Sequence, residues 1–184
     1  MKWPGDLWGY QETMATLRPS LVVEFGTCNG GSALWFADTL ERVNPFGKVL
    51  TVDIDGSTCA AEVVADPRIE RIVENSLSEA VADRIRPMRS AQPGAVFAIL
   101  DGDHSMEHVL AEMESLRDVL ESGDVLIVED SNINGHPVLP EFGPGPLEAI
   151  REYTRRWPAD YERDSEQETK FGFTFAPEGW LRRR

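Results

Sequence analysis

Three acidic residues follow two apolar segments of the sequence, and together they could bind a metal ion. Asp101 follows the apolar run 95–100, and Glu129 and Asp130 follow the run 125–128. Neighbouring parallel strands lie about 4.8 Å apart, so we expect these carboxylates to cluster where the strands end. Clustered carboxylates repel one another unless protons or a cation join them. We therefore predict a divalent metal site with Asp101, Glu129 and Asp130 as ligands, with Mg²⁺ favoured over Ca²⁺ or Mn²⁺.

His104 comes three residues after Asp101, on the turn that opens the next predicted helix. Histidine titrates near neutral pH, which suits a general base, and we predict His104 and Asp101 as the catalytic residues. Two alternatives remain open. His104 could be a surface residue, while the acids cap helices or pair with Arg and Lys. Asp101, His104 and His108 could also form the iron site of a hydroxylase, although the Glu129–Asp130 pair makes the site richer in oxygen.

Residues 21–32, Leu-Val-Val-Glu-Phe-Gly-Thr-Cys-Asn-Gly-Gly-Ser, are typical of a buried strand, a tight glycine loop (residues 26–31) and a helix start. Glycines let the backbone approach a ligand, and the N–H groups of the first helical turn face it. The segment lacks both the dinucleotide fingerprint and the lysine of a P-loop. Its pattern Glu-x-Gly-x-x-x-Gly-x-Ser resembles the first motif of class I S-adenosylmethionine-dependent methyltransferases. A plain strand–turn–helix is the alternative.

Polar residues also follow the second and third predicted strands. Asp53 ends the second strand, where nucleotide-binding folds place an acid on the ribose hydroxyls, although aspartate is also a common helix cap. Asn75 and Ser76 follow the third strand, and we predict both on the adenine side of a cofactor. Ser76 could instead cap the next helix together with Glu79.

Strands and helices alternate along the chain, and the central strands are continuous apolar runs. Such a pattern predicts an α/β fold with a parallel sheet covered on both faces, which binds ligands at the carboxyl ends of its strands. We expect a single domain over 1–184, with an N-terminal helical segment at 1–20 and a substrate-side loop at 131–146. The predicted strands are 21–25, 48–54, 69–74, 95–100, 125–128, 160–164 and 170–176, and the predicted helices are 6–17, 31–43, 57–65, 76–90, 105–121 and 147–157.

Composition narrows the range of partners and compartments. The 184 residues carry a net charge of −14, which disfavours nucleic acids and anionic membrane surfaces. No apolar run is long enough to span a membrane, and the first residues do not form a signal peptide. Cys28 and Cys59 are too few for a disulfide framework, so we predict free thiols and a cytoplasmic location.

Taken together, these motifs resemble the cephalosporin hydroxylase family, a branch of the metal-dependent class I methyltransferases. The resemblance implies a Rossmann-like, mostly parallel seven-stranded sheet, with Mg²⁺ held by the acids that match Asp101, Glu129 and Asp130. Related catechol-type methyltransferases carry a lysine base in the slot of His104, and relatives that methylate sugars carry a histidine. The matching segments are 6–12, 18–19, 23–26, 30–32, 52–55, 100–104, 128–130, 143–146, 148–149 and 177–181.

The resemblance implies an S-adenosylmethionine- and Mg²⁺-dependent O-methyltransferase that acts on a hydroxyl of a small molecule, either a sugar or a phenolic natural product. A non-catalytic cofactor-binding or assembly protein on the same fold is the alternative. His136, in the substrate-side loop, could reach the substrate. Trp3, Trp8 and Tyr10, taken as exposed, suggest a homo-oligomer in which another subunit completes the substrate site. The predicted cofactor contacts are Glu24, Gly26, Thr27, Gly30, Ser32, Asp53, Asn75, Ser76 and Asp101.

Overall fold

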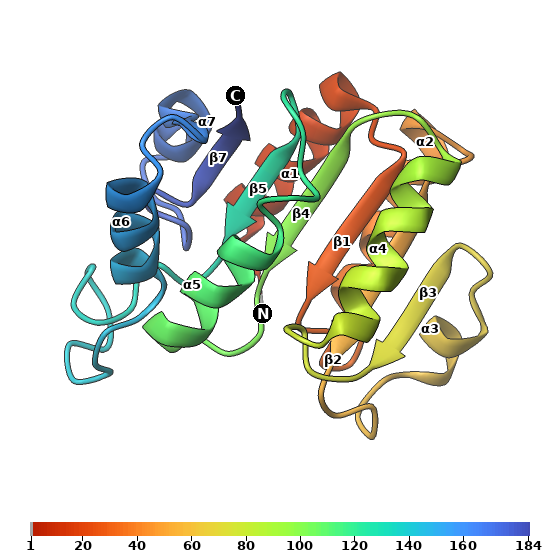
Figure 1. Ribbon diagram of the computed structural model, residues 1–184, viewed down its shortest axis with the longest axis horizontal. Coiled ribbons are helices and arrows are strands. Elements are labelled where there is room, and N and C mark those ends of the chain that lie inside the picture. The colour runs from red at the N-terminus through yellow and green to blue at the C-terminus, as the bar shows by residue number, and fades with distance from the viewer. Residues whose placement is uncertain (1) are drawn as a thin grey trace. The chain divides into compact units, whose positions relative to one another are not determined.

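The structure is a computed structural model that describes residues 2–184 (Figure 1). The strands are β1 (Leu21–Phe25), β2 (Lys48–Asp53), β3 (Ile69–Val73), β4 (Val96–Leu100), β5 (Val125–Val128), β6 (Tyr161–Arg163) and β7 (Trp180–Arg183). The helices are α1 (Pro4–Leu17), α2 (Gly31–Val43), α3 (Ala61–Ala65), α4 (Glu79–Ala91), α5 (Met106–Ser115), α6 (Pro146–Arg156) and α7 (Ser165–Thr169). Within the described residues, seven strands form one sheet in the order β3-β2-β1-β4-β5-β7-β6, which confirms the predicted fold class.

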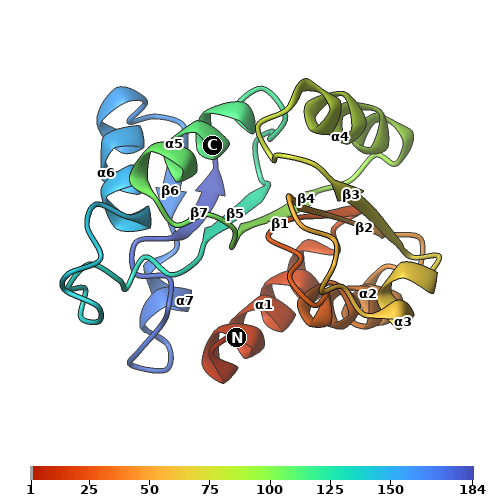
Figure 2. The same ribbon diagram turned by 90° about the horizontal axis from the view of Figure 1, so that it is seen from below.

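The chain divides into two compact units, and one of them comprises Gln11–Gly102. In this unit β3, β2, β1 and β4 run parallel, and Phe25 at the end of β1 is level with Val52 and Leu100 on the flanking strands. Figure 2 shows α4 on one face of these strands and α2 and α3 on the other. Every residue of β1 and β4 is buried, which explains why both strands are continuous apolar runs apart from one acid.

The second unit combines the residues up to Tyr10 with Asp103–Arg184. Here β7 pairs antiparallel with both β5 and β6, and α5 packs against α6. The last strand is therefore 180–183, and the strand predicted at 170–176 is wrong. Its alternating aromatic rings pack instead around Trp3, whose ring centroid lies 5.5 Å from that of Phe173.

Other predicted boundaries are wrong where a side chain from elsewhere in the chain decides them. The first helix begins at Pro4 rather than at residue 6, and the Asp6 carboxylate is buried within α1, where it accepts the backbone N–H of Phe175 at 2.9 Å. Helix α4 begins after Ser78 rather than at Ser76. Helix α5 ends at Ser115 instead of continuing to 121, and the Arg183 guanidinium donates to carbonyl oxygens beyond this end. Helix α7 lies between the two segments predicted as the last strands, 160–164 and 170–176.

Two expectations about compartment and membrane can be compared with the structure. Cys28 and Cys59 are free thiols, as predicted. No helix within residues 2–184 has the length and the apolar character that a membrane crossing requires.

The ends of β1 and β4 are held together by a close backbone contact at Gly26. The Gly26 N–H donates to the carbonyl of Val52 at 2.8 Å, and the Asp101 N–H donates to the carbonyl of Phe25 at 2.7 Å. Gly26 has a φ of 104°, and a Cβ at this position would overlap the carbonyl oxygen of Asp101. Only glycine fits both the left-handed backbone and this contact, so Gly26 fixes the point at which Asp101 leaves the sheet.

Replacement of Gly26 by alanine is expected to lower the free energy of unfolding by about 2–5 kcal/mol, because left-handed strain and overpacking add. Gly123→Ala is the matched control, since Gly123 has a φ of 95° but no atom within 4 Å of an added Cβ. The control should lose only about 1–2 kcal/mol from strain. Urea unfolding of both variants measures the difference, and equal losses would contradict the packing argument.

Candidate active site

The glycine loop turns β1 into α2 through backbone conformations that favour glycine. Gly30 has a φ of 82° and occupies the N-cap position of α2. Its N–H donates to the Thr27 carbonyl at 2.7 Å, and an added Cβ would lie 2.7 Å from a methyl carbon of Val63. Ser32 follows in the first turn of the helix. The loop therefore forms the close turn and helix start that the sequence predicted.

Beneath the glycine loop, the Glu24 carboxylate is held by a chain of two hydroxyl groups. Glu24 is fully buried on β1, and the Thr51 hydroxyl donates to its Oε2 at 2.7 Å. The Thr27 and Thr51 hydroxyl oxygens are also 2.7 Å apart. Because the single hydroxyl proton of Thr51 goes to Glu24, Thr27 must be the donor in the second bond. The sequence analysis did not identify Thr51, which sits inside an apolar strand.

Asp53 joins the end of β2 to the glycine loop. Its Oδ2 accepts the Cys28 N–H at 2.7 Å, and its Oδ1 accepts the Asp55 N–H at 3.0 Å. Asn75 is exposed beyond β3, and its side chain accepts the Leu77 N–H at 2.9 Å, closing a local turn. The structure thus places Asp53 against the loop, whereas the side-chain oxygen of Asn75 is engaged within its own turn.

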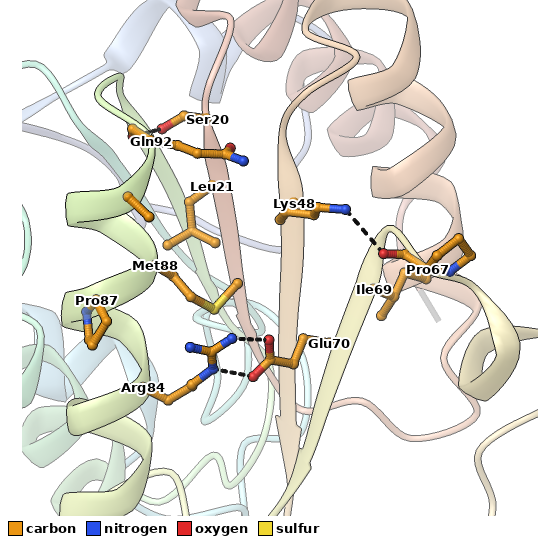
Figure 3. A pocket seen from close by; sticks show the side chains of 11 residues that line it. Ser20, Leu21, Lys48, Pro67, Ile69, Glu70, Arg84, Pro87, Met88 and Gln92 are labelled. Atoms are coloured by element: carbon orange, nitrogen blue, oxygen red, sulfur yellow. Dashed lines mark hydrogen bonds and ion pairs between the residues drawn. The ribbon is translucent and has the colours of Figure 1, made fainter.

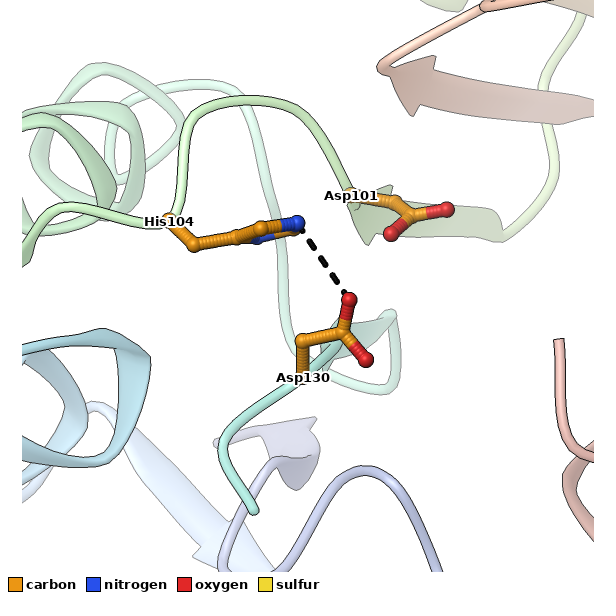
Figure 4. Close-up of side chains that lie close together, drawn as sticks. All are labelled: Asp101, His104 and Asp130. Carbon is orange, nitrogen blue, oxygen red and sulfur yellow. Dashed lines mark ion pairs between the residues drawn. The ribbon is translucent and has the colours of Figure 1, made fainter. Parts of the chain in front are cut away.

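Asp101, His104 and Asp130 form a carboxylate–histidine cluster in which one ligand atom from each residue lies within 4.8 Å of the others (Figure 4). The His104 Nε2 lies 3.3 Å from the Asp130 Oδ2. Asp130 has a φ of 52°, a left-handed conformation that aspartate tolerates better than most residues. All three side chains are partly exposed. Two carboxylates and an imidazole are a donor set that divalent cations accept, so these residues fit a metal ion.

The third predicted metal ligand, Glu129, is not among the cluster residues. Its side chain is only 2% exposed, and its Oε1 accepts the Tyr10 hydroxyl at 2.6 Å and the Lys2 ammonium at 2.9 Å. Tyr10 is fully buried, so its predicted exposure is wrong, whereas Trp8 is 57% exposed. Sequence reasoning missed the roles of Tyr10 and Lys2, although Tyr10 lies in the family-like segment 6–12.

The remaining histidines have carboxylate partners of their own. The His108 Nε2 lies 3.1 Å from the buried Glu112, one helical turn along α5. His108 is not part of the carboxylate–histidine cluster, so the two-histidine iron site is not assembled among the described residues. The His136 Nε2 lies 2.9 Å from the Glu148 Oε1.

The Glu148 carboxylate forms hydrogen bonds with residues near both ends of the substrate-side loop. Its carboxylate accepts hydrogen bonds from the Asn134 amide at 3.1 Å and from the Gly145 N–H at 2.8 Å, in addition to the contact with His136. Burial acts to raise the pKa of Glu148, but these hydrogen bonds outweigh it and the pKa lies below its ordinary value. A cavity of about 250 Å³ opens beside the loop, and its lining includes His136, Pro137, Phe173 and Thr174.

A second cavity, of about 460 Å³, lies at the opposite ends of the strands from the glycine loop (Figure 3). Leu21, Lys48 and Ile69, the first residues of β1, β2 and β3, contribute to its lining. The Arg84 guanidinium and the Glu70 carboxylate form a two-bond ion pair across it. Parallel sheets bind ligands at the carboxyl ends of their strands, so this cavity is not the predicted cofactor site.

A family model described as Rhamnosyl O-methyltransferase/CmcI matches residues 1–184. The chain belongs to this family. The resemblance inferred from the motifs is thereby confirmed, and the chain is an O-methyltransferase by family. A curated relative, the Rhamnosyl O-methyltransferase of Mycobacterium bovis (strain BCG / Pasteur 1173P2), is 51% identical over 176 residues, which cover 96% of this chain and 72% of the relative. The protein of the same name from Mycobacterium leprae (strain TN) is 50% identical, covering 100% of this chain and 80% of the relative.

Solved structures share the same fold. An apo structure of CmcI aligns with a TM-score of 0.77 and 26% identity, covering 99% of this chain and 72% of CmcI. A CmcI structure with Mg-SAM aligns with a TM-score of 0.75 and 23% identity over 100% of this chain and 72% of that chain. The MycE methyltransferase in complex with Mg, SAH and Mycinamycin VI aligns with a TM-score of 0.54 and 22% identity, covering 78% of this chain and 38% of MycE.

Replacement of Glu148 by alanine should release the substrate-side loop, because three hydrogen bonds to one carboxylate are lost. We expect faster amide hydrogen exchange over 131–146 and a loss of about 1.5–3 kcal/mol in the free energy of unfolding. Glu141→Ala, at an exposed position of the same loop, is the control and should leave exchange unchanged.

Because the pKa of Glu148 is lowered, the stabilisation that its hydrogen bonds provide should depend on pH. The carboxylate should retain its bonds above the ordinary value of 4.5, and their stabilisation should be lost as the pH falls below it. Exchange in Glu148→Ala that matches the wild type would contradict the assigned role.

Proposed function

We propose that this O-methyltransferase transfers the methyl group of S-adenosylmethionine to a sugar hydroxyl of a small molecule, and that it requires a divalent cation, Mg²⁺ first. The observation that carries the proposal is the carboxylate–histidine cluster, whose Asp101 directly follows β4, the strand that pairs with β1 beside the glycine loop. The names of the two mycobacterial relatives support a rhamnosyl group as the acceptor. The CmcI and MycE complexes with Mg and SAM or SAH support the cofactors.

The donor would bind at the glycine loop. Glu24 is rigidly held and faces the loop from β1, so it suits the methionine ammonium, while the backbone of Gly26 and Gly30 admits the ligand closely. Asp53 suits the ribose hydroxyls, as in other nucleotide-binding folds. The complete proposed set is Glu24, Gly26, Thr27, Gly30, Ser32, Asp53, Asn75, Ser76 and Asp101.

Methyl transfer from a sulfonium is an in-line displacement that proceeds faster on an alkoxide than on a neutral hydroxyl. A divalent ion lowers the pKa of a hydroxyl that it binds and holds the oxygen in place. His104 accepts the hydroxyl proton at a ring nitrogen, and Asp130, 3.3 Å away, stabilises the resulting imidazolium. Asp101, Glu129 and Asp130 are the proposed ligands. Alignment of donor and acceptor supplies a further part of the rate, up to about 7–11 kcal/mol.

The acceptor would lie against the substrate-side loop. The cavity beside the loop offers the ring of Phe173 for the apolar face of a sugar, and the imidazole of His136 for its hydroxyls. The half-exposed Trp8 on α1 supports a homo-oligomer, and the free Cys28 and Cys59 are consistent with a reducing compartment.

Replacement of Asp101 by alanine should abolish methyl transfer, while calorimetry still detects S-adenosylmethionine binding. Excess chelator should have the same effect on the wild type, because both treatments remove the ion that holds the acceptor oxygen. Asp103→Ala is the matched control, since Asp103 accepts the Ser105 N–H and lies outside the cluster. Full activity in chelator would remove the metal from the mechanism, and binding of NAD in place of S-adenosylmethionine would overturn the enzyme class.

Replacement of His104 by glutamine should lower kcat by about 10²–10⁴-fold, the contribution expected of a general base. The dissociation constants of S-adenosylmethionine and of Mn²⁺ should stay close to the wild-type values. His108→Gln, which alters a histidine paired with Glu112, should retain activity. A large rise in the Mn²⁺ dissociation constant of His104→Gln would instead identify His104 as a ligand.

A further inference from the structure

The Lys2 ammonium contacts Glu129, the predicted metal ligand that is not part of the carboxylate–histidine cluster. Its Nζ is 2.9 Å from the Glu129 Oε1, and the two side chains are only 7% and 2% exposed. The same oxygen accepts the Tyr10 hydroxyl. A buried carboxylate is stable only with a cation or several donors, so Lys2 supplies charge that Glu129 needs.

The surroundings of Lys2 are acidic on more than one side. Asp6 is 3% exposed, and burial raises its pKa. The positive charge of Lys2 opposes that rise, while the negative charge of Asp130 adds to it. Lys2 and Asp130 therefore both act electrostatically on Asp6, and Lys2 contacts Glu129, the chain neighbour of the cluster residue Asp130.

The position of Lys2 allows its ammonium group to be displaced from Glu129. Lys2 precedes α1 and belongs to no helix or strand, and its stem is flexible. Glu129 is the direct chain neighbour of Asp130, and Tyr10 would still donate a hydrogen bond to its carboxylate after the ammonium has moved. A divalent ion at the cluster would repel the ammonium and attract the carboxylate, so the two cations compete for Glu129.

We propose that Lys2 is an exchangeable counter-ion of Glu129, which holds this carboxylate in the metal-free protein and is displaced when Glu129 joins Asp130 in binding a divalent ion. Lys2 is thus a positioning residue that weakens the apparent metal affinity and keeps the metal-free site folded. The inference rests on the metal dependence of the proposed function.

The test is Mn²⁺ binding to the protein without S-adenosylmethionine, measured by calorimetry. Lys2→Met removes the charge and keeps the apolar stem, and it should bind Mn²⁺ about tenfold more tightly than the wild type, a change that corresponds to about 1.4 kcal/mol. Lys2→Arg keeps the charge and should resemble the wild type. Lys48→Met removes an exposed lysine at the start of β2 and should also bind like the wild type.

Thermal unfolding gives a second readout that needs no activity. Without Mn²⁺, Lys2→Met should have a lower Tm than the wild type, because Glu129 loses its counter-ion, and Mn²⁺ should raise that Tm by more than it raises the wild-type value. In a Glu129→Gln background, Lys2→Met should bring no gain in affinity. If Lys2→Met proves too unstable, Lys2→Gln removes the charge and retains a hydrogen-bond donor.

The outcomes separate the two proposals. A Mn²⁺ affinity of Lys2→Met that is equal to or weaker than that of the wild type overturns the counter-ion role, as does the absence of Mn²⁺ binding in both proteins. Methyl transfer that persists in excess chelator is the separate result that removes the metal from the proposed function.

Discussion

The structure depends on how it stabilises the negative charges of the carboxylates that lie on or directly after the buried strands. An ionised carboxylate taken out of water is costly unless hydrogen bonds or a cation replace its hydration. Three acids, one within β1 and two directly after β5, meet this demand differently. Glu24 is served by neutral hydroxyls, Glu129 by Tyr10 and Lys2, and Asp130 by the His104 ring.

The donor side and the metal side of the proposed site are built on different principles. At the glycine loop, the backbone and buried hydroxyls determine the geometry, and a substituent as small as a methyl group at Gly26 has no room. At the cluster, Asp130 adopts a left-handed conformation and its side chain remains partly exposed. In the proposed function, rigid contacts would therefore position the methyl donor, whereas the groups proposed to meet the ion and the proton stand on short turns.

Sequence reasoning succeeded where the deciding signal was local. Apolar runs that end in glycine or an acid located β1 and β4, and the alternation of strands and helices predicted the mostly parallel α/β sheet. It failed where a partner distant in sequence decides the outcome. Phe173 and Phe175 alternate like residues of a strand, yet Trp3 at the other end of the chain holds them, and Glu129 finds Tyr10, 119 positions away, in preference to the cluster. No window of the sequence contains either pairing.

In the proposed function, the substrate-side loop would let one catalytic centre serve different acceptors. Besides its own backbone hydrogen bonds, the loop is held by the Glu148 carboxylate, which binds Asn134, His136 and the Gly145 N–H. None of these residues belongs to the carboxylate–histidine cluster, so a change in the loop would leave the proposed metal ligands and base in place. The family description already spans rhamnosyl O-methyltransferases and CmcI.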